Sequence, residues 1–175
     1  MKLQTIEKQM EKKKLVIAGC GKLGNIVADA VVGGLLDGYE LVGAYSRSRE
    51  KAEALAHKVN ERNGHCMVAD TFDRLLGLKP DFMVEAASPA AMREWALPAL
   101  GNGTSVVTLS IGAFADDAFY EEAGRVASEN GAHVYIVSGA TGGFDVLQTT
   151  ALMGGAKAEF FNEKGPDALR GTAVY

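Results

Sequence analysis

The sequence predicts an α/β fold, namely a doubly wound parallel sheet followed by the start of a second, α+β domain. Short apolar runs rich in β-branched residues alternate along the chain with segments of helical length and periodicity. A glycine-rich turn separates the first run from the first helical segment, as in sheets built from βαβ units. A chain of 175 residues with 47% hydrophobic residues can bury one good core, so we expect one complete domain and part of another.

The first predicted strand and its turn carry the clearest motif. Residues 15–18 (LVIA) are typical of a strand buried on both faces of a parallel sheet. Gly19, Gly21 and Gly24 then form G-x-G-x-x-G ahead of a helical segment at 25–36, the arrangement of a dinucleotide-binding turn. The first glycine permits the tight turn, the second lets backbone N–H groups approach a pyrophosphate, and the third lets the helix pack against the strand. An ordinary turn in a chain with 21 glycines is the alternative interpretation.

The residues after the second predicted strand (40–45, ELVGAY) bear on the choice of cofactor. An NAD site has an acidic residue there, which accepts hydrogen bonds from the ribose 2′-hydroxyl. This chain instead has SRSR at 46–49 and no carboxylate before Glu50. Hydroxyl and guanidinium groups suit a 2′-phosphate better, so NADP is favoured over NAD, with dual use expected. Alternatively, Ser48 caps the helix predicted at 49–63 and the arginines are solvated.

A third and a fourth strand are predicted at 65–69 and 81–85, joined by a brief helix whose expected N-cap is Asp70. Strand order reverses between the first and fourth strands of such a sheet, and ligands lie at that point, so the turn at 86–89 (AASP) is a second predicted cofactor contact. A serine N-cap followed by proline at the first helical position would explain the same turn without a ligand. Glu85 closes an apolar strand, where a carboxylate is costly unless it is paired or near solvent, so a pairing or polarising role is a hypothesis.

The last predicted strands end in polar and glycine-rich turns. Fifth and sixth strands are predicted at 104–109 and 133–137, with Asp116 as N-cap of the helix between them at 117–130. Residues 138–145 (SGATGGFD) follow the sixth strand. A turn of this kind can hold the carboxylate of a small substrate, and it is equally typical of a flexible interdomain connection.

Four stretches together resemble the L-aspartate dehydrogenase family. They are residues 19–24 (GCGKLG), 85–89 (EAASP), 110–116 (SIGAFAD) and 138–145 (SGATGGFD), and they occur in the family's order. The resemblance implies NAD(P)-dependent oxidation of L-aspartate at Cα to iminoaspartate. That product hydrolyses to oxaloacetate and ammonia or enters NAD biosynthesis.

The resemblance also divides the chain and assigns site residues. It implies a Rossmann-type domain at 14–140 after a polar extension at 1–13, and the beginning of a substrate and dimerisation domain at 141–175. Ala113 is expected to lie against the cofactor. Taken together with the motifs above, the predicted cofactor-binding residues are Gly19, Gly21, Lys22, Leu23, Gly24, Ser46, Arg47, Ala87, Ser88, Pro89 and Ala113. The predicted substrate-binding residues, which would border the nicotinamide, are Ser138, Gly139, Ala140, Gly142 and Gly143.

Two departures from the family pattern qualify what it implies. The family's acidic residue after the second strand is replaced by Ser46 and Arg47, which supports the phosphate interpretation. Family members are also longer, and none of this chain's three histidines, His57, His65 and His133, matches the family's catalytic position. We therefore expect a C-terminally truncated member, weakly active or inactive alone, whose catalytic residues stay unassigned.

Composition narrows the class of partner. A net charge of −4 with no basic cluster beyond 12–14 argues against nucleic acid. Two cysteines, Cys20 and Cys66, are typical of a reduced cytoplasmic protein and do not suggest a metal site. No apolar run reaches the length of about 18 residues that a membrane span needs. We expect a small-molecule substrate, L-aspartate, and a homodimer. The alternatives are a dinucleotide-binding module without turnover and a homoserine-dehydrogenase-like oxidoreductase.

Overall fold

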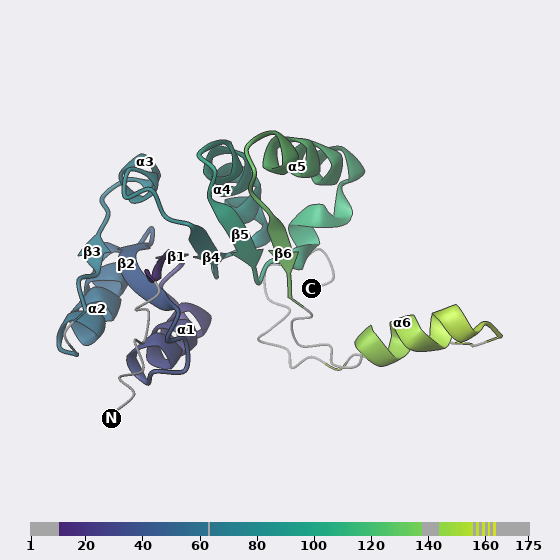
Figure 1. Cartoon of the computed structure of the whole chain (residues 1–175), viewed down its shortest axis with the longest axis horizontal. Coiled ribbons are helices and arrows are strands. Elements are labelled where there is room, and N and C mark those ends of the chain that lie inside the picture. The colour runs from purple at the N-terminus through teal and green to yellow at the C-terminus, as the bar shows by residue number, and fades with distance from the viewer. Residues whose placement is uncertain are drawn as a thin grey trace, which may run out of the picture. The chain divides into compact units, whose positions relative to one another are not determined.

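The computed structural model describes residues 11–62, 64–137 and 144–155, together with residues 157, 159, 161 and 163. The chain divides into two compact units, residues 1–139 and 140–175. The first unit is a six-stranded, wholly parallel sheet with helices on both faces (Figure 1). The predicted doubly wound α/β fold is therefore confirmed. Its elements are β1 (Lys13–Ala18), α1 (Lys22–Val32), β2 (Tyr39–Tyr45), α2 (Arg49–Asn60), β3 (Met67–Val68), α3 (Phe72–Leu76), β4 (Phe82–Glu85), α4 (Pro89–Gly101), β5 (Ser105–Thr108), the 3₁₀ helix η1 (Ile111–Ala115), α5 (Asp117–Glu129) and β6 (Val134–Ile136).

The strand order is β3-β2-β1-β4-β5-β6, so the direction of winding reverses between β1 and β4. The register brings four strand ends into line at one edge of the sheet. Ala18 of β1 pairs with Tyr45 of β2 and with Glu85 of β4, and Glu85 pairs with Thr108 of β5. The turns that follow these four residues therefore meet at the carboxyl edge, where a doubly wound sheet binds its ligands.

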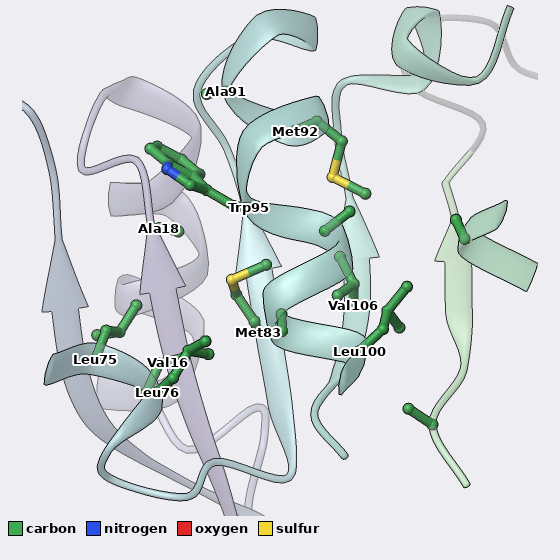
Figure 2. Close-up of a cluster of buried hydrophobic side chains, with 14 of the residues drawn as sticks. Val16, Ala18, Leu75, Leu76, Met83, Ala91, Met92, Trp95, Leu100 and Val106 are labelled. Atoms are coloured by element: carbon green, nitrogen blue, oxygen red, sulfur yellow. The ribbon is translucent and has the colours of Figure 1, made fainter. Parts of the chain in front are cut away.

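Alternation along β1 explains why its last four residues, 15–18, are all apolar. Leu15 and Ile17 belong to the hydrophobic cluster beneath α1 and α2, whereas Val16 and Ala18 belong to the cluster beneath α3, α4 and α5. Figure 2 shows the second cluster, in which Val16, Met83 and Val106 of the sheet meet Trp95 and Leu100 of α4. The central strand is thus buried on both faces, as its composition predicts.

Side chains determine where several helices begin. The Oγ of Ser88 accepts from the Ala91 N–H at 3.2 Å with Pro89 as the first residue of α4, and Asp116 caps α5. Both caps confirm the sequence prediction. Asp70, in contrast, is not the cap of α3. That position is taken by Thr71, whose hydroxyl accepts from the Arg74 N–H.

Other boundaries also differ from the predicted ones, and two of them have a visible cause. Helix α1 ends at Val32, because Gly34 adopts φ +73 in the turn that follows, whereas the helical segment was predicted to reach residue 36. Strand β3 comprises only two residues. The backbone N–H and C=O of Cys66 are bound by the side chain of Asn60 at 2.7 and 3.0 Å, which takes the place of ladder hydrogen bonds there.

The second unit contains α6 (Phe144–Met153) among its described residues. None of the helices in the described part of the chain combines the length and apolar character needed to cross a membrane.

Candidate functional site

The glycine turn after β1 is shaped by two close approaches that only glycine permits. Gly19 has φ +106, and a Cβ there would lie 2.6 Å from the backbone of Ala86. A Cβ on Gly24 would lie 2.2 Å from the carbonyl oxygen of Gly19, so the first turn of α1 rests directly on the strand end. Gly21 is different, because no atom lies within 4 Å of the position of its Cβ. The turn therefore leaves open space beside the backbone of Gly21.

The side chain of Asn25 holds this turn in place. Its Nδ2 donates to the carbonyl oxygens of Cys20 at 3.3 Å and Gly21 at 3.0 Å, and its Oδ1 accepts from Lys58 Nζ at 2.9 Å. The free N–H groups at the start of α1 consequently have a fixed direction. Sequence reasoning missed Asn25, although a polar side chain one turn into a helix after G-x-G-x-x-G was a visible signal.

A cavity of about 310 Å³ opens where the turns meet. Its walls are residues 19–21, residues 46–48 after β2, Lys51 of α2, Ala86 and Ala87 after β4, and Trp95 of α4. A second hollow of about 290 Å³ shares Ser46 and Arg47 with the first and adds Asp70. The predicted residues Gly19, Gly21, Ser46, Arg47 and Ala87 are thus brought together around one space.

The cationic groups around the cavity differ in what they bind. Arg49 contacts Glu53 at 2.7 Å and also binds Asp70, contacts that raise the pKa of its guanidinium. Arg47 and Lys51 are exposed, and their side chains make no ion pair or hydrogen bond within the described part of the chain. Lys51 was missed by sequence reasoning, because its position on a charged amphipathic helix gives no sign that it faces the cavity.

Trp95 supplies an unpaired donor beside the same space. Its side chain is 2% exposed and packs edge-on to Tyr45 and stacked on Phe72, each with ring centroids 5.5 Å apart. Its Nε1 has no hydrogen-bond partner among the described residues. A buried donor without a partner is costly. The open space at Gly21 fits a polar ligand, and the free cations nearby fit an anionic one.

The other predicted cofactor residues lie around the rim or beneath it. Lys22 and Leu23 are exposed at the start of α1 and do not line the cavity. Ser88 and Pro89 form the start of α4, and the hydroxyl of Ser88 is used by its cap. Ala113 is fully buried in the core and does not line the cavity.

Glu85 has the pairing that its position required, although the partners are not cations. Its Oε1 accepts from the N–H groups of Ala87 and Ser88 at 2.8 and 3.1 Å, and the hydroxyls of Thr108 and Ser110 also donate to the carboxylate. The carboxylate is fully buried. It faces the underside of the turns and does not line either hollow.

Neither the cysteines nor the histidines provide a reactive group at this edge. Burial raises the pKa of the Cys20 thiol to about 11 and that of Cys66 to about 12. His57 lies in the last turn of α2, and His65 and His133 precede β3 and β6. All three histidines therefore lie toward the opposite, amino edge of the sheet. No group of three or more potential metal ligands occurs among the described residues.

The predicted substrate residues, Ser138, Gly139, Ala140, Gly142 and Gly143, fall outside the described residues.

Comparison with known proteins agrees with the geometry. Residues 19–137 match the family described as the homoserine dehydrogenase NAD-binding domain. The chain belongs to this family. Its domain therefore binds a nicotinamide dinucleotide, and the family takes its name from the enzyme class that the sequence analysis held as an alternative.

Relatives named L-aspartate dehydrogenase share more of the chain. The protein of Methanocaldococcus jannaschii is 33% identical over 139 residues, covering 79% of this chain and 50% of that protein. The protein of Methanothermobacter thermautotrophicus is 34% identical over 153 residues, covering 87% and 57%. The solved structure of aspartate dehydrogenase from Thermotoga maritima matches with a TM-score of 0.56 and 26% identity, over 79% of this chain and 51% of that one. The resemblance to the L-aspartate dehydrogenases is confirmed, and the chain spans about half the length of these relatives.

Proposed function

We propose that this chain is the dinucleotide-binding part of an NAD(P)-dependent oxidoreductase that oxidises L-aspartate to iminoaspartate, and hence to oxaloacetate and ammonia, with NADP favoured. The observation that carries the cofactor assignment is the open backbone at Gly21 facing a cavity with two unpaired cations, Arg47 and Lys51. The substrate assignment is supported by the named relatives. Because the chain spans about half of those proteins, it rests on their names and not on a substrate pocket among the described residues.

The chain's own residues would bind and orient the dinucleotide. The first N–H groups of α1 have no partner within the helix and lie beside the open space at Gly21. The oxygens of a pyrophosphate bound there would accept hydrogen bonds from them. A bound nicotinamide ring would accept the hydride that leaves the substrate Cα. The protein's part in that step is to hold the ring at the carboxyl edge, since no histidine of this chain lies there to take a proton from the amine.

The preference for NADP is supported by the charges around the ribose side of the cavity. Arg47 borders both hollows and is free to bind a 2′-phosphate, and Lys51 adds a second positive charge. The nearby carboxylate, Asp70, is bound by Arg49 and so is a poor acceptor for a ribose 2′-hydroxyl. A 2′-phosphate could therefore bind the free side chains of Arg47 and Lys51, whereas a ribose 2′-hydroxyl would have to compete with Arg49 for Asp70.

Binding without turnover is the second candidate function. It is favoured by one observation, the position of all three histidines at the amino edge, away from the place where hydride transfer would occur. The test is an assay of the purified chain with L-aspartate and NADP+, following the absorbance of the reduced cofactor. Turnover would support the dehydrogenase, and tight NADPH binding without turnover would support the binding module.

The cofactor assignment is tested by replacing Arg47 and Lys51. Arg47→Ala should weaken NADPH binding by about ten- to a hundredfold, because a charge-assisted hydrogen bond is worth about 1.5–3 kcal/mol, and should leave NADH binding nearly unchanged. Lys51→Ala should act in the same direction. Nicotinamide fluorescence measures both affinities. Arg62→Ala is the matched control, since Arg62 is an exposed arginine just beyond the far end of α2.

Equal losses of NADPH and NADH affinity in Arg47→Ala would contradict a 2′-phosphate contact. Failure of the unaltered chain to bind either cofactor would contradict the site as a whole.

We also propose a cytoplasmic location and a homodimer. The location is supported by Cys20 and Cys66, which are both free and buried. The homodimer is supported by β6, one of the two edge strands of the described sheet, where Tyr135 and Ile136 are 46% and 49% exposed.

A further inference from the structure

The buried carboxylate of Glu85 is the centre of a hydrogen-bond network beneath the carboxyl edge. Its Oε1 accepts from the Ala87 N–H at 2.8 Å, the Ser88 N–H at 3.1 Å and the Ser110 hydroxyl at 3.0 Å. Its Oε2 accepts from the Thr108 hydroxyl at 2.9 Å. Oε1 is therefore engaged by donors from two turns, one after β4 and one after β5, and Oε2 by the last residue of β5. A fully buried carboxylate with this many donors fixes the groups that bind it.

Thr108 extends the network to the backbone of the second turn. Its Oγ1 donates to Glu85 and also accepts from the Ser110 N–H at 3.0 Å. Ser110 is thus held twice, through its hydroxyl by Glu85 and through its N–H by Thr108. The start of the turn that leads to η1 has little freedom as long as both contacts are present.

The same network reaches the glycine turn by packing. The Ala86 N–H donates to the Ala18 carbonyl oxygen at 2.8 Å, and Gly19 approaches Ala86 so closely that a Cβ would lie 2.6 Å away. Each half of a doubly wound sheet takes one half of a dinucleotide. The 310 Å³ cavity extends from Arg47, after β2, to Ala87, just across the reversal point after β4. The Ser110 turn does not line this cavity and lies farther along, after β5. The network therefore lies beneath the half that would receive the nicotinamide.

We propose that Glu85 and Thr108 are positioning residues that set the nicotinamide half of the site by fixing the turn at Ser110. The inference rests on the dinucleotide function proposed above. Loss of the Thr108 hydroxyl would leave the Ser110 N–H and one oxygen of Glu85 without their partners. The turn at Ser110 would become more mobile, and the nicotinamide ring would no longer be held in one position. The residues that line the cavity for the adenosine half would stay in place.

Thr104 provides a matched control for Thr108. Both threonines are fully buried, and Thr104 lies immediately before β5 while Thr108 ends it. The Thr104 hydroxyl also makes one donated bond, to the Pro80 carbonyl oxygen at 2.9 Å, and one accepted bond, from Asn102 at 3.3 Å. Thr104→Val and Thr108→Val remove the same group from the same kind of environment at opposite ends of one strand.

The experiment compares two ligands in the full 175-residue chain. NADPH binding is followed by nicotinamide fluorescence. Binding of 2′,5′-ADP, which carries the adenosine half alone, is followed by the emission of Trp95, the chain's single tryptophan and a wall of the cavity. Thermal melting of each variant measures the cost to stability.

Thr108→Val should weaken NADPH binding by about tenfold, equivalent to about 1.4 kcal/mol, and change 2′,5′-ADP binding by less than about twofold. Thr104→Val should leave both affinities within about twofold of the unaltered chain. It should lower the melting temperature about as much as Thr108→Val does. Glu85→Gln, which keeps the shape but turns one acceptor oxygen into a donor, should resemble Thr108→Val.

Four results separate this inference from the proposed function. Equal NADPH affinities in Thr108→Val and Thr104→Val, or equal losses for both ligands in Thr108→Val, would overturn the positioning role. An unaltered chain that binds NADPH without oxidising L-aspartate would favour the binding module over the dehydrogenase, and the variants would still confirm or overturn the positioning role by their NADPH and 2′,5′-ADP affinities. An unaltered chain that binds neither ligand would overturn both.

Discussion

Substitution by alanine should affect stability at Gly24 and cofactor binding at Gly21, although both glycines belong to one motif. At Gly24 an added Cβ would lie 2.2 Å from the Gly19 carbonyl oxygen, which is about 1 Å closer than a C···O contact of about 3.3 Å. The obstacle is backbone, so neither group can turn aside. At Gly21 the Cβ would meet nothing within 4 Å, and its φ of −80 suits any residue. Gly24→Ala should therefore damage the fold, and Gly21→Ala should damage only binding.

The magnitudes follow from two opposing effects at Gly24. Alanine gains about 0.5–1 kcal/mol over glycine inside a helix. Overpacking against a rigid neighbour costs about 1–3 kcal/mol or more. We expect a net loss of about 1–2 kcal/mol in the free energy of unfolding, or a melting temperature lower by about 3–6 °C for a chain of this size. Gly21→Ala should melt within about 1 °C of the unaltered chain and bind NADPH about ten- to a hundredfold more weakly, since its methyl group would occupy the space left for the pyrophosphate.

Gly124 gives the control for helix propensity. It lies inside α5, and a Cβ there would meet nothing within 4 Å, so Gly124→Ala should raise stability by about 0.5–1 kcal/mol. Thermal melting and NADPH titration of the three variants complete the comparison. A Gly24→Ala protein as stable as Gly124→Ala would refute the close packing of α1 on the strand end. Unchanged NADPH binding in Gly21→Ala would refute the pyrophosphate position.

Two further predictions concern the thiols and the helix caps. Because burial raises the pKa of Cys20 to about 11 and of Cys66 to about 12, both thiols are protonated at pH 8 and should react with a disulfide reagent only after the chain is unfolded by denaturant. Immediate reaction of two thiols in the native chain would contradict this. Thr71→Ala should cost about 1 kcal/mol in a denaturant titration, because its hydroxyl caps α3, while Ser48→Ala should cost less than half as much, because Ser48 makes no cap bond. Equal costs would show that the cap contact of Thr71 contributes little.

Local signals in the sequence were sufficient for most of the fold. The apolar run at 15–18 predicted a strand buried on both faces, and that is where β1 lies. Ser88 with Pro89 predicted the start of α4, because a cap and its first residue act within one turn of the chain. The error at Asp70 arose because a neighbouring threonine could perform the same role, and nothing local distinguished the two.

The candidate site was only partly accessible to sequence reasoning. The predicted residues Gly19, Gly21, Ser46, Arg47 and Ala87 do surround one cavity. Their grouping was predictable because parallel strands end at a common edge. Lys51 and Trp95 line the same cavity and were missed, since nothing in the local sequence indicates that either helix turns that side chain toward the carboxyl edge.

The sequence by itself determined the βαβ order, the glycine turn and the absence of a carboxylate after β2, because each depends on residues close together in the chain. Only the tertiary structure decided which charges are free. Arg47 and Arg49 stand two positions apart in similar sequence, yet Arg49 is bound to Asp70 from another part of the chain and Arg47 faces the cavity. It likewise decided that Glu85 is held by Thr108 and Ser110, more than twenty residues away. Electrostatic pairing depends on distance in space, and the folding of strands side by side sets that distance.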